Sequence, residues 1–264
     1  MLQVKDVSKT FNQGTANETA ALRNLSLHVK QGDYVTLIGG NGSGKSTLLN
    51  CIAGVFNVDQ GHIIVDSQDL TGCSEHKRAK VFGRVFQDAM VGTSAQMTIE
   101  ENLALALRRG MRRTLSRGIA PKEKTLFQER LKILELGLEH RLDTQVGLLS
   151  GGQRQALTLL MSILREPKVL LLDEHTAALD PKTAVRVLEL TDRIVQDRQL
   201  TTLMVTHNMR DAIRYGNRLV MMYDGTIILD VKGEAKRRLS VEYLLNLFDQ
   251  ASGEEFPDQK ALLA

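Results

Sequence analysis

The sequence is poor in cysteine and has no long hydrophobic run. Only Cys51 and Cys73 occur among 264 residues, without a CxxC or Cys/His spacing. This argues against a disulfide scaffold and a structural zinc site, and is typical of a reducing compartment. The most apolar stretch is Ala156–Leu164, between Arg154 and Arg165. Because a membrane span needs about 20 apolar residues, we expect no segment that crosses a bilayer.

A strong charge excess is also lacking. Lys and Arg number 34 against 31 Asp and Glu, a net charge of +3. This balance disfavours a dedicated nucleic-acid binder. The first residues, MLQVKDVSKTF, have no apolar region, so we expect no signal peptide. Hydrophobic residues at 42% and charged residues at 25% are typical of a globular protein of one to two domains.

Strand-like and helical patterns alternate along most of the chain, which predicts an α/β fold with a largely parallel sheet. Residues 98–138 are instead almost entirely helical in pattern, with a break expected around Gly118–Pro121. We therefore expect a helical insertion at about 89–152 within a core of about 1–88 and 153–234. A C-terminal helix and polar tail are expected at 235–264. The expected strands are Leu2–Val7, Leu22–Val29, Tyr34–Ile38, Gly61–Val65, Val81–Phe86, Val169–Leu172, Leu200–Val205, Arg218–Tyr223 and Thr226–Asp230. The expected helices are about Ser46–Ala53, Ile99–Arg109, Lys182–Asp197 and Val241–Phe248.

One motif points directly to phosphate binding. The segment GGNGSGKST fits G-x-x-x-x-G-K-[ST] between a strand and a helix. Its glycines let successive backbone N–H groups face phosphate oxygens, and the helix N-terminus adds a favourable dipole. Lys45 would reach the β- and γ-phosphates, and the Ser46 hydroxyl would ligate Mg²⁺. The motif therefore predicts nucleoside triphosphate binding by Gly39, Gly40, Asn41, Gly42, Ser43, Gly44, Lys45, Ser46 and Thr47.

Two acidic residues follow the apolar strand Val169–Leu172. Asp173 is placed to hold magnesium through water. Glu174 is placed as the general base that orients and deprotonates the attacking water, a role typically worth about 10²–10⁴ in rate. Such a pair is common by chance, and the preceding phosphate motif is what favours the catalytic interpretation.

Further motifs narrow the class. LSGGQ occupies Leu149–Gln153, and AALD follows the acidic pair at Ala177–Asp180. Gln87 ends VFGRVFQ and His207 ends TTLMVTH. With these motifs in this order, the chain from about Leu2 to Asp230 resembles the nucleotide-binding subunit of ATP-binding-cassette (ABC) transporters. The resemblance implies a P-loop NTPase core with an N-terminal antiparallel β subdomain and an inserted helical subdomain.

The resemblance also assigns roles to individual residues. Phe11 would stack on adenine, with simple core packing as the alternative. Gln87 would contact the magnesium or the attacking water and report occupancy to the insertion. His207 would contact the γ-phosphate and steady Glu174, the alternative being an ordinary strand-end histidine. His175 stands where the family usually has proline. In the family, the signature residues bind the γ-phosphate of the ATP that the partner subunit's phosphate loop holds. Asp180 would lie at the dimer interface. The signature residues here are Ser150, Gly151, Gly152 and Gln153.

Two surface expectations remain. The family's insertion receives a coupling helix from the membrane subunit, and Asp88–Ile99 is the candidate segment, unless it forms only loop and subdomain core. A basic run on or after the helix Ile99–Arg109 is either a solvated face or a contact with anionic lipid, and Lys236–Arg238 is a weaker copy. The run comprises Arg108, Arg109, Arg112, Arg113 and Arg117.

The resemblance therefore implies an ATP-hydrolysing, Mg²⁺-dependent subunit at the cytoplasmic face of the membrane. Its expected partners are a second copy in a homodimer, a separate membrane permease and, indirectly, a solute-binding protein, with no nucleic acid. Import of an amino-acid-like solute is the expected task. The alternative is a soluble ABC ATPase of a cytosolic assembly system, such as that for iron–sulfur clusters.

Overall fold

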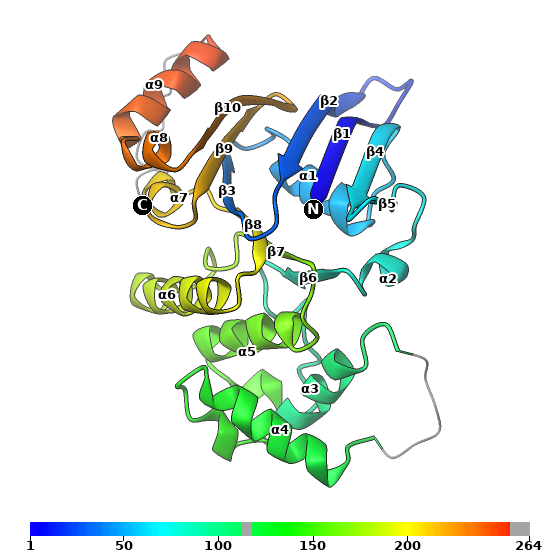
Figure 1. Ribbon diagram of the computed structural model, residues 1–264, viewed down its shortest axis with the longest axis vertical. Helices are drawn as coiled ribbons and strands as arrows, with labels where there is room; N and C mark the ends of the chain where they lie inside the picture. The colour runs from blue at the N-terminus through cyan, green and yellow to red at the C-terminus, as the bar shows by residue number, and fades with distance from the viewer. Residues whose placement is uncertain (112–117, 254–264) are drawn as a thin grey trace. The chain divides into compact units, whose positions relative to one another are not determined.

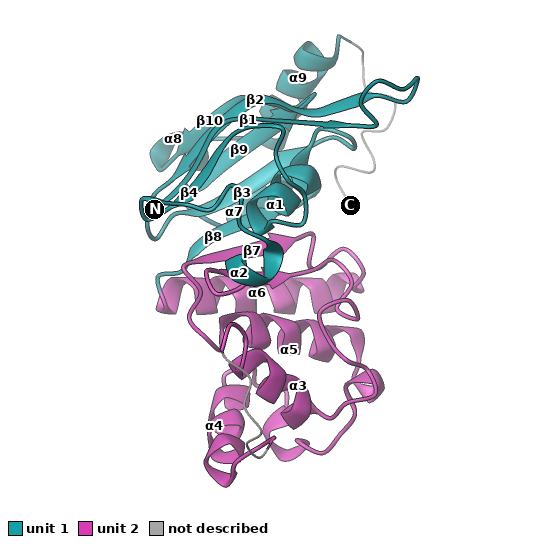
Figure 2. Cartoon of the chain, turned by 90° about the vertical axis from the view of Figure 1, so that its right-hand side faces the viewer, with its two compact units in different colours: residues 1–78, 199–264 teal, residues 79–198 magenta. Residues whose placement is uncertain are grey.

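The computed structural model describes residues 1–111 and 118–253, which form two compact units. Unit 1 joins residues 1–78 to the chain from residue 199 onward, and unit 2 comprises residues 79–198. Figure 1 labels the helices and strands, and Figure 2 colours the two units. The expected insertion at about 89–152 falls within unit 2, and its boundaries stay a prediction.

Unit 1 holds a four-stranded antiparallel sheet of order β2-β1-β4-β5 and a second group of strands of order β10-β9-β3-β8. Strand β3 runs parallel to both β8 and β9, whereas β9 and β10 form an antiparallel hairpin. The hairpin turns at Asp224 and Gly225, as the sequence predicts. The strands are β1 (Leu2–Phe11), β2 (Thr19–Val29), β3 (Tyr34–Gly39), β4 (Gln60–Val65), β5 (Gln68–Asp69), β8 (Thr201–Val205), β9 (Arg218–Tyr223) and β10 (Thr226–Lys232).

The helices of unit 1 pack against these strands. Helix α1 contacts both β2 and β3, while α7 and α9 pack on β3 and β9 (Figure 1). The predicted C-terminal helix is four residues longer than expected and ends before Gly253, whose φ is 68°. The helices are α1 (Lys45–Ala53), α2 (Glu75–Arg78), α7 (Met209–Arg214), α8 (Glu234–Arg237) and α9 (Val241–Ser252).

Strand β1 continues beyond the Val7 end that the hydrophobic alternation predicts. It reaches Phe11, which pairs with Thr19, through register shifts along the β1–β2 ladder. Asp6, with a φ of 49°, lies at the first irregularity. The register shifts break the alternation of apolar and polar residues, and the last residues of β1 are mostly polar. The hydrophobic pattern alone therefore predicts a strand that is too short.

Unit 2 contains one parallel strand pair and most of the longer helices. Strand β6 pairs with β7 from Phe82↔Val169 to Val85↔Leu172. Helix α5 contacts β6, α3, α4 and α6, and most of its residues are buried. The elements are β6 (Phe82–Val85), α3 (Ile99–Leu107), α4 (Pro121–Lys132), η1 (Leu138–His140), η2 (Val146–Leu148), α5 (Gly151–Ile163), β7 (Val169–Asp173) and α6 (Pro181–Asp197).

In unit 2 the break expected around Gly118–Pro121 precedes α4, but the helices end earlier than the sequence pattern predicts. Helix α3 ends at Leu107 rather than Arg109, just before the left-handed Gly110 with a φ of 73°. Helix α4 begins at Pro121. Only short 3₁₀ turns follow α4 before the signature helix. Within residues 1–111 and 118–253, we find no helix long and apolar enough to cross a membrane.

Candidate functional site

The predicted phosphate loop joins β3 to α1 in unit 1. All six residues of β3 are buried, so the strand anchors the loop in the core. Two glycines are required by space as well as by conformation. At Gly39 a Cβ would overlap the Met222 carbonyl oxygen, and at Gly44, which has a φ of 97°, it would overlap the Ala21 carbonyl oxygen. Gly44 is the N-cap residue of α1 and has no side chain to accept from the first-turn amides, which suits an anion site.

Lys45 lies inside this loop and is only 6% exposed. Its ammonium donates to the carbonyl oxygens of Gly39 and Gly40, each at 2.9 Å, and to Ser43 Oγ at 3.4 Å. These contacts hold the positive charge at the centre of the loop. An incoming phosphate would therefore meet a cation already in place. Its oxygens would replace the two carbonyl oxygens as hydrogen-bond acceptors of the Lys45 ammonium.

His207 leaves the same sheet edge as the phosphate loop. Leu37 of β3 pairs in parallel with Val205 of β8, and His207 follows Val205 by two residues. The turn is held by the Asn208 amide, which donates to Thr206 Oγ1 at 3.1 Å. His207 is exposed at this edge. The structure thus brings together two groups that the sequence assigns to the γ-phosphate.

Phe11 ends β1 and is half-buried rather than fully in the core. Its ring meets that of Phe56 edge to face, with centroids 5.2 Å apart. Lys9 Nζ lies 5.6 Å from the Phe11 ring centroid. Adenine stacking stays a prediction for this partly exposed ring.

In unit 2, the carboxyl ends of β6 and β7 bring Gln87 close to the acidic pair. Val85 of β6 and Leu172 of β7 are register partners in parallel strands. Gln87 follows Val85 by two residues, and Asp173 and Glu174 follow Leu172 directly, so all three leave the same edge. Gln87 is exposed, and the two acids are half-buried. This juxtaposition suits a site that holds a metal and an attacking water.

Sequence reasoning missed two residues that organise this edge. Arg84 Nη2 lies 3.3 Å from Asp173 Oδ2, with both side chains largely buried. Gln155 of α5 donates to the Phe86 carbonyl at 3.1 Å and so anchors the chain just before Gln87. The only signal for Arg84 is a charge within an otherwise apolar strand, while Gln155 has no local signal because it acts across 69 positions.

Glu174 and His175 form the turn after β7. Glu174 has a φ of 43°, in the left-handed region that non-glycine residues seldom adopt. His175 is 2% exposed, and its Nε2 lies 3.1 Å from Thr191 Oγ1 on α6. Burial lowers the pKa of His175 to about 4, so the ring is neutral at pH 7. His175 therefore fastens the turn that carries Glu174 to α6.

The signature residues begin α5. Ser150 is the N-cap residue, and a capping box joins it to Gln153: the Gln153 amide donates to Ser150 Oγ at 3.3 Å and the Ser150 amide donates to Gln153 Oε1 at 3.2 Å. Ser150 and Gly151 are exposed, whereas Gly152 is buried, where a Cβ would overlap Thr183 Cγ2 of α6. The helix start is thus fixed internally while its first residues face outward.

Asp180 caps the neighbouring helix α6. Its Oδ1 accepts from the Thr183 amide at 3.1 Å. The hydrogen bonds from Thr183 hold the pKa of the Asp180 carboxyl below its usual range. Asp180 is exposed. A position at a dimer interface stays a prediction beside this observed capping role.

The candidate docking segment has an apolar surface. Met90 is 40% exposed and Val91 is 66% exposed, while Ala89 and Ile99 are buried. The Arg154 guanidinium donates to the Met90 sulfur, which ties the segment to the signature helix. Some residues of the segment are thus core and others surface, and docking of a coupling helix stays a prediction.

The two described arginines of the basic run are half-buried, and each bonds to another part of unit 2. Arg108 pairs with Glu123 at 3.0 Å, and Arg109 donates to the Ser162 carbonyl at 2.9 Å. Burial and then repulsion from Arg165 lower the pKa of Arg109. Arg109 is thus turned inward. A residue on a solvated face or at a lipid contact would instead point outward. Arg112, Arg113 and Arg117 lie outside the described residues.

The second basic run, Lys236–Arg238, is also not a surface patch throughout. Lys236 is 2% exposed. Its ammonium donates to the carbonyl oxygens of Tyr215 and of Gly216, the latter at 2.9 Å. Because these carbonyls follow α7, the lysine fastens α8 to that helix instead of facing an anionic partner.

The residues proposed for magnesium are hard oxygen donors. Within the described chain, we find no group of three His, Cys, Asp or Glu side chains arranged to hold a metal. Mg²⁺ needs no such cage, because it usually keeps several waters and takes one or two protein oxygens plus substrate phosphates. Each residue by itself offers such an oxygen: Ser46 is exposed in the first turn of α1, and Asp173 is the last residue of β7.

Sequence comparison finds related proteins over nearly the whole chain. The family described as ABC transporter matches residues 22–177. The tyrosine transport ATP-binding protein of Clostridioides difficile is 48% identical over 95% of this chain and 100% of that protein. The methionine import ATP-binding protein MetN of Clostridium tetani is 34% identical over 93% of this chain and 76% of that protein.

Comparison with solved structures agrees. The dimeric post-hydrolysis state of the ATP-binding cassette MJ0796 bound to ADP and Pi matches with a TM-score of 0.75 and 30% identity, over 88% of this chain and 98% of that chain. The ADP conformation of the cassette MJ1267 matches with a TM-score of 0.76 and 28% identity, over 94% of this chain and 98% of that chain. The expected α/β fold with an antiparallel N-terminal sheet and a helical insert is confirmed.

Proposed function

Since this chain belongs to the ABC transporter family, as an ATP-binding subunit of the importer type, we propose that two copies close around two ATP molecules. The observation that carries the proposal is the exposed start of the signature helix, at Ser150 and Gly151. Each chain thus presents two helix N-termini suited to phosphate, one at the loop around Lys45 and one at α5. A symmetric pair uses both when the signature of one copy meets the ATP held by the loop of the other. The match to a dimeric cassette supports this arrangement.

The chain hydrolyses ATP to drive transport, and its residues divide the work. Lys45 and the α1 amides bind the β- and γ-phosphates. Glu174 accepts a proton from the attacking water, and Gln87, at the same sheet edge, orients that water. His207 donates to the γ-phosphate from the edge of β8. Phosphoryl transfer depends mainly on positioning and charge stabilisation, which these polar groups supply.

Magnesium would be held by Ser46, with Gln87 contacting the ion or the attacking water and Asp173 acting through water. When bound, the ion supplies positive charge that neutralises the phosphate oxygens. Arg84 holds Asp173 in place at 3.3 Å. This keeps the carboxylate at the strand end, where its ionised form is the one that accepts hydrogen bonds from metal-bound water.

For the transported solute we propose an amino acid or a similar small molecule, imported through a separate permease that receives solute from a binding protein. The tyrosine transport subunit at 48% identity and the methionine import subunit at 34% support this class. The exposed Met90 and Val91 are the proposed contact for the permease, and the proposal puts the subunit at the cytoplasmic face of the membrane. The alternative of a cytosolic assembly ATPase gains no support from these relatives.

A purification experiment tests the proposal. The Glu174→Gln chain, tagged and recovered from its own cells in mild detergent with ATP, should bring down a polytopic membrane protein in stoichiometric amount. A Lys45→Ala chain, which cannot hold ATP, shows how much of this recovery depends on nucleotide. Recovery of soluble partners alone, or of the dimer alone, would contradict the transporter role while leaving the ATPase mechanism in place.

A further inference from the structure

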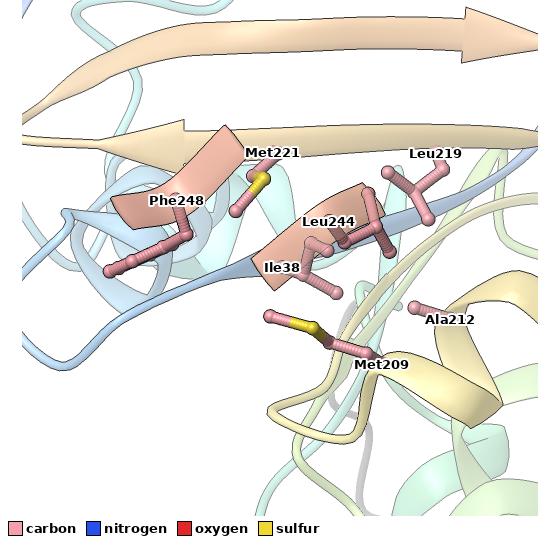
Figure 3. Packing of buried hydrophobic residues seen from close by; sticks show 7 residues of the cluster. All are labelled: Ile38, Met209, Ala212, Leu219, Met221, Leu244 and Phe248. Carbon is pink, nitrogen blue, oxygen red and sulfur yellow. The ribbon is translucent and has the colours of Figure 1, made fainter. Parts of the chain in front are cut away.

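Helix α9 is docked on the strand that leads into the phosphate loop. Leu244 and Phe248, one helical turn apart, are 0% and 3% exposed. They pack in a cluster with Ile38 of β3 and Met221 of β9 (Figure 3). The helix starts at a capped end, because Ser240 Oγ accepts from the Tyr243 amide at 3.1 Å. Helix α9 is therefore part of the core of unit 1.

The Phe248 ring extends from this cluster to the phosphate loop itself. A Cβ placed on Gly40 would lie 2.6 Å from Phe248 Cζ and 3.4 and 3.5 Å from its two Cε atoms. The ring tip therefore lies against the Gly40 α-carbon. On its other side the ring meets Tyr223 edge to face, with centroids 5.7 Å apart. Tyr223 ends β9 next to Met222, the register partner of Gly39.

The segment that carries Phe248 is fixed at a second place. The buried Lys236 ammonium ties α8 to the carbonyl oxygens at the end of α7. Helix α9 follows α8 after three residues, and α7 itself contacts both β3 and α9. A ring held in this way resists displacement, so it can restrain the loop backbone that it touches.

We propose that helix α9 braces the phosphate loop and that Phe248 is a positioning residue for ATP. This rests on the proposed role of the loop around Lys45 in holding the phosphates. Glycine-rich backbone loses much conformational freedom when it is ordered. A loop that adopts its binding conformation only part of the time binds ATP more weakly by that fraction. The Phe248 contact at Gly40 raises the fraction by blocking motion of the loop toward α9.

Gly40 makes a sharp test possible. Its backbone is outside the left-handed region, so alanine is permitted there by conformation. The three atoms nearest to a new methyl group would all belong to the Phe248 ring. Gly40→Ala should therefore weaken ATP binding while Phe248 is present, and the Gly40 methyl should fill part of the space left by Phe248→Ala.

The experiment is a double-mutant cycle on the purified full chain, with the dissociation constant of a fluorescent ATP analogue as the readout. Phe248→Ala should raise the constant about tenfold, if the ordered loop falls to about one tenth of the population. Gly40→Ala should raise it as well. The dissociation constant of the double variant should not exceed the larger of the two single-variant constants, because the two changes affect the same contact. Additive effects would overturn the proposal.

Matched variants separate the ring contact from general loosening of the helix. Tyr243, 49% exposed on α9, should tolerate alanine with unchanged affinity. Leu244→Ala removes buried area from the same face without reaching Gly40, so its effect should be additive with that of Gly40→Ala. Phe248→Leu keeps an apolar side chain and should restore part of the affinity. An unchanged ATP affinity in a folded Phe248→Ala chain would overturn the proposal.

Steady-state kinetics and a reference variant complete the design. Phe248→Ala should raise the KM for ATP and leave kcat within about twofold, because the ring does not touch the reacting atoms. A lower kcat with unchanged KM would indicate a merely structural loss and contradict the assignment. If the wild-type chain binds the analogue and Lys45→Ala does not, the proposed role of the loop around Lys45 stands whatever Phe248→Ala does. If the wild-type chain fails to bind, the proposed function itself fails.

Discussion

At the scale of single residues, Glu174 is the group on which turnover should depend most. It follows β7 in a left-handed conformation with a φ of 43°. We expect Glu174→Gln to bind ATP normally and to hydrolyse it about 10²- to 10⁴-fold more slowly, because the amide cannot accept the proton of the attacking water. Single-turnover hydrolysis and equilibrium binding separate the two effects. Hydrolysis at the wild-type rate would show that another residue is the base.

His175 gives a second prediction, about pH. Burial lowers its pKa from 6.5 to about 4. The unfolded chain therefore takes up a proton as pH falls below 6.5, whereas the folded chain does not until about pH 4. The folded chain therefore loses stability as the pH falls from 6.5 toward 4. Between pH 8 and pH 5, His175 should lower the free energy of unfolding by about 2 kcal/mol.

Urea unfolding at the two pH values measures this contribution. His175→Gln keeps a polar group near Thr191 and removes the titration, so its loss of stability between pH 8 and pH 5 should be smaller by about 2 kcal/mol. His140, with a side chain that is 80% exposed, serves as the matched control. An equal pH dependence in His175→Gln and the wild-type chain would show that His175 is not the responsible group.

At the scale of elements, the two capping boxes allow a direct comparison. Ser150 with Gln153 caps α5, and Thr98 with Glu101 caps α3 in the same way. Alanine at either cap position should lower the free energy of unfolding by about 1 kcal/mol. Only Ser150→Ala should also lower ATP hydrolysis, because only the α5 start would meet ATP. Equal hydrolysis by the two variants would argue against a phosphate contact at Ser150.

The strand–turn–helix segments were predictable because their signals are local. Apolar runs place β3 and β7, the glycine pattern places the loop before Lys45, and Asp173 ends its strand as expected. The contacts between elements were not predictable in this way. Arg84 with Asp173 spans 89 positions, and Phe248 beside Gly40 depends on where α9 packs. Helix α3 was predicted to reach Arg109 but ends at Leu107, with Arg108 as its C-cap residue.

Secondary elements without an apolar pattern were missed because contacts between distant residues, rather than local sequence, determine them. Helix α2 (Glu75–Arg78) has only polar side chains, and the order around it comes from Arg78, which is 1% exposed. Its guanidinium donates to carbonyl oxygens of Cys51 and Ile52 at the end of α1, and to those of Thr71 and Cys73. Such a buried arginine, bound by distant carbonyls, has no signature in the local sequence.

At the scale of the whole molecule, the proposed composite site makes each chain half of the machine. Two variants damage different halves. Lys45→Ala removes the phosphate-loop cation but keeps the signature helix, whereas Ser150→Arg keeps ATP binding by the monomer and obstructs the signature surface. Each variant alone should be inactive. A homodimer of either variant has two identical sites, and both sites lack either the phosphate-loop cation or a usable signature surface.

Mixing the two inactive chains should restore ATP hydrolysis. A mixed dimer has one complete site, in which the loop of the Ser150→Arg chain faces the signature of the Lys45→Ala chain. Random pairing of equal amounts makes half of the dimers mixed, so the restored rate should reach at most about one quarter of the wild-type rate. Steady-state phosphate release measures it, with each variant assayed alone at the same total concentration. If each chain hydrolysed ATP within its own two units, mixing would add nothing, because no chain in the mixture has both halves intact.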